Sequence, residues 1–232
     1  MGARIAPRVW VSDSIDPLER QDMHRWTQQL LPLELLGAHI HSGGSHTTHR
    51  MHDLGFRAGT AVFGHLGIEW DLTEASEAEL AELAEWIAFY RENRALLHTG
   101  RMVRMDDIDP TFRVSGVVAA DRASALFSLA HLGRSDAAPL GRFTLRGLDP
   151  DRRYRVRPLS IGNPSHGVQV PPWFGTADAR LASDGVTPLS PRLPHGALAD
   201  GVVLSGRVLE SAGLQTPMSY PDQVWLVSVT AV

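Results

Sequence analysis

The sequence predicts a chain in two parts: an α/β part over residues 1–100 and an all-β part over residues 101–232. In the first hundred residues, short apolar runs alternate with helical patterns, which is typical of parallel βαβ units. From Arg101 onward the pattern changes to short runs rich in Val, Leu and Phe, separated by turn residues. Such spacing is typical of an antiparallel β-sandwich.

The α/β part begins with a short apolar strand over Val9–Val11. Pro17 suits the first turn of a helix, which we expect to reach about Leu31. A second strand is expected over Leu33–Ile40, followed by a polar loop over His41–His52. A second helix over Phe56–Leu66 then leads to a third strand over Gly67–Leu72.

A third helix is marked by a capping box, because Ser76 precedes Glu79 by three residues. The residues behind it repeat at helical spacing and predict one buried face. These residues are Leu80, Leu83, Ala84, Ile87, Tyr90, Arg94 and Leu97. Gly100 is a plausible end for this helix.

The all-β part shows no further helical pattern of any length. Its predicted strands are Phe112–Ala119, Ala125–Leu132, Gly141–Arg146, Tyr154–Pro158, Gly201–Leu209 and Val224–Val232. Gly147–Asp151 predicts a turn between two of them. The stretch Asn163–His195 is rich in Pro and Gly and predicts a long irregular connection, in which Trp173 and Phe174 would close one end of the sandwich.

The amino-acid composition argues against several kinds of partner and site for this protein. Hydrophobic residues make up 43% and charged residues 21% of the 232 residues, as in ordinary globular proteins. The net charge of -4 argues against nucleic acid as a partner. There is no cysteine, hence no disulfide or thiolate site. No apolar run approaches the roughly 20 residues of a membrane span, so we expect no membrane contact and a cytoplasmic protein.

Two acids, Asp13 and Asp16, follow the first strand directly. In barrels of alternating strands and helices, this end of a strand carries the catalytic side chains. Both acids are therefore candidates for a catalytic site, and a plain helix cap is the other interpretation of Asp13. Asp16 has a second interpretation, as the N-terminal cap of the helix that begins at Pro17.

The string W-x-S-D-x-x-D-x-x-E-R over Trp10–Arg20 resembles the general acid/base segment of bacterial α-galactosidases, or melibiases, of glycoside hydrolase family 36. Further segments resemble the same family, in the same order and over nearly the whole chain. They are Leu36–His39, Ser45–Arg50, Arg57–Leu72, Ile87–Arg91, Leu145–Tyr154 and Gly213–Pro217.

This resemblance implies the C-terminal three βα units of a TIM (β/α)₈ barrel, followed by the family's C-terminal antiparallel sandwich. It also implies a retaining glycosidase that releases terminal α-linked galactose from oligosaccharides such as melibiose and raffinose. Asp13 would be its general acid/base, and Trp10, Ser12 and Asp16 are candidates for binding substrate. The indole of Trp10 either packs in the core or lies against the sugar ring as a platform. No cofactor is implied.

The family's nucleophile, in a K-W-D-like strand end upstream of the acid/base, has no counterpart in residues 1–7. Trp70-Asp71 looks similar, but its neighbours place Asp71 in the connection after the family's last barrel strand. A whole barrel needs about 250 residues, and three strands leave two open sheet edges. We therefore expect an N-terminally truncated chain that forms oligomers or requires the missing half of the barrel. The alternative is a non-catalytic remnant or partner subunit of a split glycosidase, binding sugar at most.

Five histidines fall within fourteen residues: His39, His41, His46, His49 and His52. Such spacing can bind a transition metal, and a metal-dependent hydrolase is a third hypothesis. However, the loop is rich in Gly and Ser and contains no H-E-x-x-H helix. We favour a hydrogen-bonded loop near the mouth of the barrel, with a metal site or a contact with sugar as the alternatives.

Overall fold

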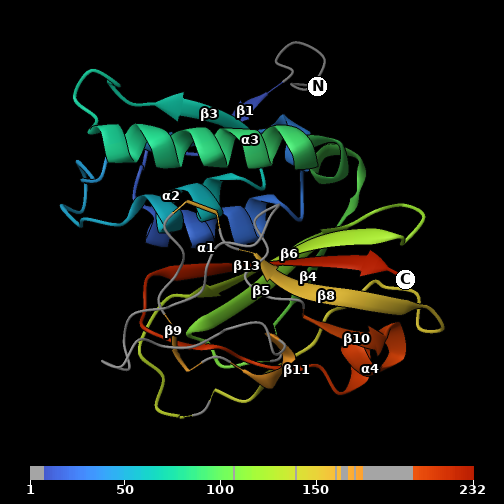
Figure 1. Cartoon of the computed structure of the whole chain (residues 1–232). Helices are drawn as coiled ribbons and strands as arrows, with labels where there is room; N and C mark the ends of the chain where they lie inside the picture. Colours follow the sequence, from blue (N-terminus) through green and yellow to red (C-terminus); the bar gives the residue numbers. More distant parts are fainter. Residues whose placement is uncertain are drawn as a thin grey trace. The chain divides into compact units, whose positions relative to one another are not determined.

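The computed structural model divides the chain into two compact units (Figure 1). Unit 1 comprises residues 1–98 and 161–163, and unit 2 comprises residues 99–160 and 164–232. The structure describes residues 8–106, 108–138, 140–159, 161–162, 167–169, 171–174 and 201–232. Most of the predicted connection Asn163–His195 therefore lies outside the described residues.

Unit 1 alternates strands and helices as predicted. Its elements are β1 (Val9–Trp10), α1 (Pro17–Thr27), β2 (Leu36–His41), α2 (Leu54–Ala61), β3 (His65–Glu69) and α3 (Glu77–Thr99). The strands form one parallel sheet with β2 in the middle. Because Trp10 pairs with Gly37 and His41 with Glu69, the carboxyl ends of the strands meet at one edge.

Two helix boundaries in unit 1 differ from the prediction. Helix α1 ends at Thr27 rather than near Leu31, and a short 3₁₀ helix, η2 (Leu33–Leu35), takes the start of the predicted second strand. Helix α2 ends at Ala61, which lets β3 begin at His65.

Gly64 explains the early end of α2. A Cβ atom at this position would lie 2.7 Å from the Cβ of Ala38 and 2.8 Å from the carbonyl oxygen of Leu36. The chain thus passes directly against β2 at Gly64. Val62 and Phe63 are buried in this turn and extend the apolar pattern without extending the helix.

Helix α3 begins with the predicted capping box: Glu79 N donates to Ser76 Oγ at 3.3 Å, and Ser76 N donates to Glu79 Oε2 at 3.0 Å. The buried face differs from the prediction. It comprises Leu83, Trp86, Phe89, Tyr90 and Leu97, whereas Leu80, Ala84 and Arg94 are exposed. The large rings at positions 86 and 89 rotate the buried stripe away from the regular repeat.

Contact between α3 and β3 is fixed by a hydrogen bond, in which Leu66 N donates to the Tyr90 hydroxyl at 3.2 Å.

Within the described part of the chain, no helix is both long enough and apolar enough to cross a membrane.

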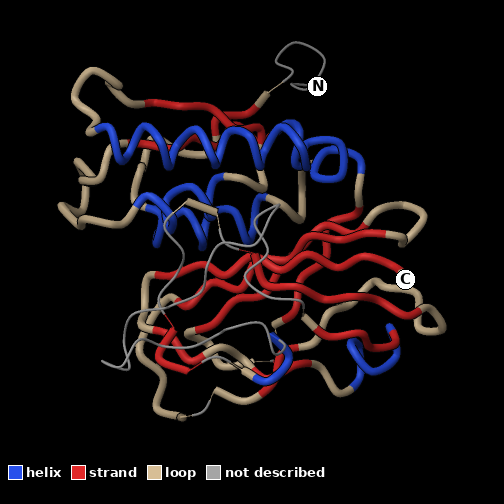
Figure 2. The backbone as a smooth tube through the Cα atoms, in the orientation of Figure 1, coloured by secondary structure: helices blue, strands red, loops and turns tan. Residues whose placement is uncertain are grey.

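Unit 2 is built on a six-stranded antiparallel sheet in the order β10-β8-β13-β6-β5-β4 (Figure 2). Its strands are β4 (Arg101–Met105), β5 (Phe112–Val118), β6 (Ser124–His131), β8 (Arg153–Leu159), β10 (Val202–Ser205) and β13 (Gln223–Ala231). Two smaller sheets pair β7 (Arg142–Phe143) with β11 (Leu214–Gln215), and β9 (Gly167–Gln169) with β12 (Met218–Ser219).

The core of unit 2 joins the large sheet to these smaller pairs. Phe127 and Val227 come from the large sheet, and Phe143 from the small pair β7-β11. The rings of Trp173 and Phe174, in the 3₁₀ helix η3 (Pro172–Phe174), pack edge to face at 4.5 Å within the same core. Their burial agrees with the closing role predicted for this pair.

The predicted strand Gly201–Leu209 is wrong in its second half. Strand β10 ends at Ser205, whose Oγ caps the helix α4 (Gly206–Ser211) by accepting from Val208 N at 3.3 Å. Helix formation here brings Gly206 against the backbone, because a Cβ would lie 2.0 Å from the Asp149 carbonyl oxygen. Strands β4, β9, β11 and β12 were not predicted, and the predicted strand Gly141–Arg146 is reduced to β7.

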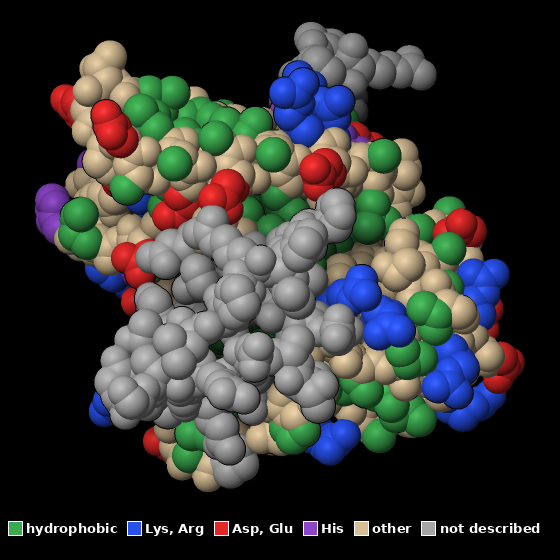
Figure 3. Space-filling model, viewed as in Figure 1, with side chains coloured by type: hydrophobic (Ala, Val, Ile, Leu, Met, Phe, Trp, Pro, Cys, Tyr) green, Lys and Arg blue, Asp and Glu red, His purple; other side chains and the backbone are tan. Residues whose placement is uncertain are grey.

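Strand β8 alternates arginines with core residues. Arg153, Arg155 and Arg157 alternate with the buried Tyr154 and Val156. The chain has no lysine, so every blue side chain in Figure 3 is an arginine, and several gather over unit 2.

Candidate active site

The carboxyl edge of the parallel sheet in unit 1 gathers the polar residues of the site. Strand β1 leads into Asp13 and Asp16, β2 carries His39 and His41, and β3 ends at Glu69. This edge of a parallel α/β sheet is where ligands and catalytic groups are placed.

Asp13 lies in a turn whose backbone is fixed on both sides. Ser12 Oγ accepts from Ser14 N at 3.0 Å, and Arg20 Nε donates to the Ser14 carbonyl at 2.5 Å. Ser14 Oγ in turn donates to Glu19 Oε2 at 3.0 Å. Asp13 itself is exposed, and no hydrogen bond to its carboxylate is formed within the described part of the chain. The backbone on either side of Asp13 is therefore fixed, while its carboxyl is exposed to solvent.

Asp16 is the N-terminal cap of α1, which confirms the second interpretation of this residue. Its side chain is 0% exposed and accepts from Leu18 N at 2.9 Å and Glu19 N at 3.4 Å. Its other oxygen accepts from the Thr48 hydroxyl and from Arg50 Nε, the latter at 2.7 Å.

The charge of Asp16 is stabilised in place. Burial raises the pKa of this carboxyl, but the hydrogen bonds from Thr48, Arg50 and the backbone outweigh burial and leave the pKa below its usual value. Asp16 thus joins helix α1 to the histidine loop as an ionised group. A direct contact with substrate stays a prediction.

Trp10 covers His39. The two rings stack with centroids 4.2 Å apart and planes 8° apart, and Trp10 remains 53% exposed. Gly37 provides the space, since a Cβ there would lie 3.1 Å from Trp10 Cε3. Beneath the indole, Nε2 of His39 lies 2.5 Å from Glu69 Oε2.

Arg20 completes this cluster. Its Nη1 donates to the His39 carbonyl at 2.6 Å, and its Nη2 contacts the His39 ring. Burial, and next the charge of Arg20, lower the pKa of His39 to about 3. Burial also lowers the pKa of Arg20 to about 10, against the opposing effect of Glu69. His39 is therefore neutral at neutral pH, and its Nε2 contacts both the Arg20 guanidinium and the Glu69 carboxylate.

The histidine loop is closed by its own hydrogen bonds, as expected for a hydrogen-bonded loop. Ser45 N donates to the Arg50 carbonyl at 3.0 Å, and His49 N to the Ser45 carbonyl at 2.9 Å. Arg57 joins both ends of the loop, because its guanidinium donates to the carbonyls of His41 and His52. Among the described residues, no three His, Asp or Glu side chains are grouped to hold a metal ion.

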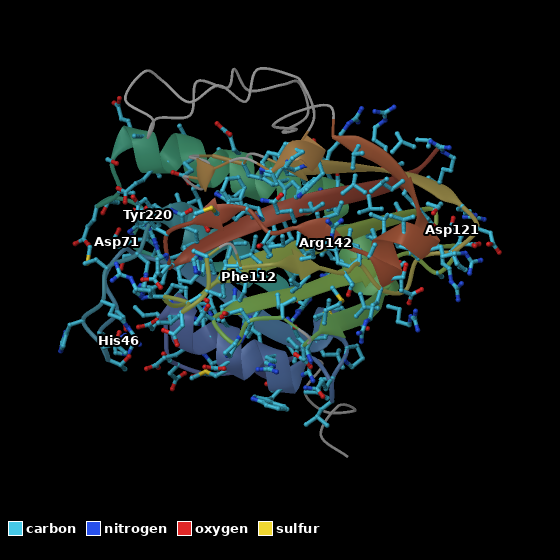
Figure 4. The ribbon with its side chains drawn as sticks, turned by 90° about the horizontal axis from the view of Figure 1, so that it is seen from below. His46, Asp71, Phe112, Asp121, Arg142 and Tyr220 are labelled. Carbon is cyan, nitrogen blue, oxygen red and sulfur yellow. The ribbon has the colours of Figure 1, made fainter. Side chains whose placement is uncertain are left out.

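Asp71 follows β3 in an exposed turn, as predicted from its neighbours (Figure 4). It accepts from Thr73 N at 3.0 Å and from Thr73 Oγ1 at 2.7 Å. These hydrogen bonds lower the pKa of its carboxyl.

Sequence reasoning missed the roles of Arg20 and Glu69. Arg20 is visible in the sequence as the end of the motif that begins at Trp10, but that pattern does not say what it binds. Glu69 reaches His39 through the pairing of β2 with β3, and no local pattern records that pairing.

Comparison with known families places the chain among the glycoside hydrolases. The Melibiase family model matches residues 3–100, and the model of the glycosyl hydrolase family 36 C-terminal domain matches residues 114–226. The chain belongs to glycoside hydrolase family 36, a family of enzymes.

Relatives agree with this assignment. The chain is 31% identical over 229 residues to an α-galactosidase of Escherichia coli, covering 96% of this chain and 29% of that protein. It is 29% identical over 156 residues to the α-galactosidase AgaA of Geobacillus stearothermophilus, covering 67% of this chain and 21% of that protein. The chain thus spans less than a third of the length of these relatives.

Solved structures share the fold. The crystal structure of the α-galactosidase from Lactobacillus brevis aligns with a TM-score of 0.74 at 25% identity, covering 97% of this chain and 26% of that one. A variant of AgaA from G. stearothermophilus, crystallised with raffinose, aligns with a TM-score of 0.73 at 23% identity and the same coverage.

Proposed function

We propose that this chain forms part of a retaining α-galactosidase, which hydrolyses terminal α-linked galactose in oligosaccharides such as melibiose and raffinose. The observation that carries the proposal is the exposed carboxyl of Asp13, held at the carboxyl end of β1. Residues 1–100 would then be three βα units of a (β/α)₈ barrel, and residues 101–232 its C-terminal sandwich domain.

Asp13 is the proposed general acid/base. Retaining hydrolysis uses two carboxyls about 5–5.5 Å apart. A carboxylate nucleophile attacks C1 of galactose while Asp13 gives its proton to the departing glycosidic oxygen. Asp13 then takes a proton from the water that attacks C1, which releases galactose and restores both carboxyls. We assign the nucleophile to the remainder of the barrel, on a longer polypeptide or on a second chain.

Trp10 is the proposed platform for the sugar. One face of its indole lies on His39, and the side chain keeps enough exposed surface for the apolar face of galactose. The hydrogen bonds of Ser12 and Asp16 are made within the protein, so we propose that these residues fix the turn that carries Asp13. Their direct contact with substrate stays a prediction from the sequence.

The test uses a chimera in which this chain replaces the aligned 229 residues of the E. coli relative. In that chimera, Asp13→Asn should lower the rate of raffinose hydrolysis by about 10²–10⁴-fold, the usual contribution of general acid–base catalysis. With a p-nitrophenyl α-galactoside as the substrate, Asp13→Asn should lower the rate of the first step less, because this leaving group needs little protonation. Added azide should restore turnover of this aryl substrate in the variant and yield galactosyl azide.

Asp71→Asn is the matched control, since it alters an exposed carboxylate at the end of a neighbouring strand. It should leave raffinose hydrolysis nearly unchanged. Raffinose turnover that survives Asp13→Asn, or is lost equally in Asp71→Asn, would exclude Asp13 as the acid/base.

The alternative is a non-catalytic chain that acts as a partner subunit of a split glycosidase. It is favoured by the sheet of unit 1, in which β1 and β3 each pair only with β2 among the described strands. The chain alone should then associate with itself or with a barrel fragment in size-exclusion chromatography, with no turnover until the fragments are mixed. Turnover by the isolated monomer would exclude this alternative.

A further inference from the structure

Arg20 is a buried arginine to which the proposed reaction assigns no role. It stands on α1, is 4% exposed, and its guanidinium reaches two backbone carbonyls rather than solvent. Arginine is seldom buried so completely, because taking its charge out of water is costly unless the group is paired and hydrogen-bonded. The contacts of this side chain therefore indicate its role.

Two of these contacts join the turn of Asp13 to the middle of the parallel sheet. Arg20 Nε donates to the Ser14 carbonyl at 2.5 Å, and Nη1 donates to the His39 carbonyl at 2.6 Å. Ser14 directly follows Asp13, and His39 stands on the central strand β2. One rigid, planar group thus holds both carbonyls, so the turn and the strand cannot separate without breaking a charge-assisted hydrogen bond.

The guanidinium is itself held in place and charged. Its Nη2 contacts the His39 ring, whose Nε2 also contacts the Glu69 carboxylate at the end of β3. Burial lowers the pKa of Arg20 to about 10, against the opposing charge of Glu69. The side chain is therefore protonated at neutral pH, and its position is fixed by groups on β2 as well as by the turn.

The other anchors of this turn are more local. Ser12 Oγ accepts from Ser14 N at 3.0 Å, in a hydrogen bond between neutral groups two residues apart. Asp16 accepts from Leu18 N at 2.9 Å and so fixes the start of α1. Arg20, by contrast, uses a charged donor and reaches a residue 19 positions along the chain. It is the anchor that relates the turn to the neighbouring strand.

We propose that Arg20 is the positioning residue of the general acid/base. By fixing the Ser14 carbonyl against β2, it sets where the carboxyl of Asp13 meets the glycosidic oxygen. The inference rests on the proposed role of Asp13, and Arg20 acts through the backbone of that residue without touching substrate. A proton donor must lie within hydrogen-bond reach of its oxygen, and a displacement of about 1 Å can cost about 10²-fold in rate. Loosening the turn should therefore slow proton transfer to the leaving group.

The geometry is tested in the full 232-residue chain by NMR. The Nε–H proton of Arg20 should exchange with water about tenfold or more slowly than that of Arg91, which is exposed on α3, because a buried donor must open before it exchanges. In Arg20→Gln, the order parameters of the Asp13 and Ser14 amides should fall from about 0.85 to below about 0.6. Equal exchange of the two protons, or an equally rigid turn in the variant, would overturn the proposal.

The consequence for catalysis is tested in the chimera with the E. coli relative. Arg20→Gln should lower kcat/KM for raffinose by about 10–100-fold. The same variant should lower kcat/KM for the p-nitrophenyl α-galactoside by less than about threefold, because that leaving group needs little protonation. The ratio of the two values reports proton transfer to the leaving group, since a loss of folded protein lowers both values equally.

Two further variants separate positioning from charge and from stability. Arg20→Lys keeps the charge, but its single ammonium cannot reproduce the planar fork, so kcat/KM for raffinose should stay about tenfold low. A parent-like value in Arg20→Lys would assign the effect to charge and overturn the proposal. Gly64→Ala is the control for stability, because its new methyl group crowds Ala38 and the Leu36 carbonyl on β2. The ratio should keep its parent value in Gly64→Ala.

The positioning role and the proposed function can fail separately. Loss of raffinose hydrolysis in Asp13→Asn, together with a parent-like ratio in Arg20→Gln, would refute the positioning role and leave the proposed function intact. Raffinose hydrolysis that survives Asp13→Asn would refute the assignment of Asp13, and the positioning role with it. A ratio that falls as far in Gly64→Ala as in Arg20→Gln would show that lost stability is the cause.

Discussion

The indole of Trp10 lies flat on the imidazole of His39, with ring centroids 4.2 Å apart. Together with the contacts of Glu69 and Arg20 to the same ring, the stack leaves His39 only 3% exposed. His39 stands on β2, the central strand of the sheet.

Replacing Trp10 with Ala should raise the pKa of His39 from about 3 toward its ordinary value, because burial is the largest cause of the lowered pKa. NMR titration of the histidine rings would measure this change. Trp10→Phe keeps a stacked ring and should give a smaller rise. An unchanged titration of His39 in Trp10→Ala would show that the indole does not shield it.

Arg50→Ala should destabilise unit 1 by about 1–3 kcal/mol, although Arg50 is 42% exposed. The reason is Asp16, which is fully buried and would keep its charge with one donor fewer. Chemical denaturation followed by circular dichroism measures the loss. The matched control is Arg91→Ala on the exposed face of α3, which should change stability by less than about 0.5 kcal/mol. Equal effects of the two variants would contradict the role of Asp16.

The stability of unit 1 should fall as the pH drops from about 6.5 toward 4. Burial lowers the pKa of His24 to about 4, whereas an unfolded histidine titrates near 6.5. In this window the unfolded chain binds a proton that the folded chain does not, so acid favours unfolding. His24 alone accounts for about 3 kcal/mol at the low end.

His24→Gln should reduce this dependence but not abolish it. The amide can still donate a hydrogen bond and does not titrate, whereas His39, whose pKa is also lowered, keeps its contribution. Thermal unfolding at pH 7, 6 and 5 measures the slope, and His46→Gln in the exposed loop is the control. The contribution of Asp16 falls in a separate window. Its pKa is lowered in the folded state, so its stabilisation is lost only as the pH falls below about 4.

Gly64→Ala should destabilise unit 1 by about 1–3 kcal/mol, because the new methyl group would overlap both Ala38 and the backbone of Leu36. Gly67→Ala is the matched control three residues away. Its Cβ would meet nothing nearer than 3.9 Å. Denaturant midpoints of the two variants make the comparison, and a midpoint for Gly64→Ala as high as for Gly67→Ala would refute the close contact.

Sequence reasoning succeeds here where the information is local. The capping box of Ser76 and Glu79 lies within four residues, and the structure forms it as predicted. The same holds for the turn at Gly147, where φ is +87° and Asp149 Oδ1 accepts from Asp151 N at 3.1 Å. The parallel sheet was also predicted, because the alternation of strands and helices leaves few other arrangements.

It fails where long-range contacts decide the structure. The end of α2 depends on Gly64 meeting β2, and the short strands β9, β11 and β12 exist only through partners far along the chain. In the candidate site, Asp13 and Asp16 follow from the local strand-to-helix pattern. The contact between His39 and Glu69 depends on strand pairing, and the contact between Asp16 and Arg50 spans 34 residues.

Because Asp16 is buried and Arg50 is partly exposed, the order in which the two residues are replaced during evolution matters. If Asp16 changes first to a neutral capping residue, the half-exposed guanidinium of Arg50 can turn to water, and the later loss of Arg50 is nearly neutral. If Arg50 changes first, a charge is stranded in the interior. Homologues in which the pair has been lost should therefore have passed through an ancestor with a neutral residue at position 16, and seldom through the reverse order.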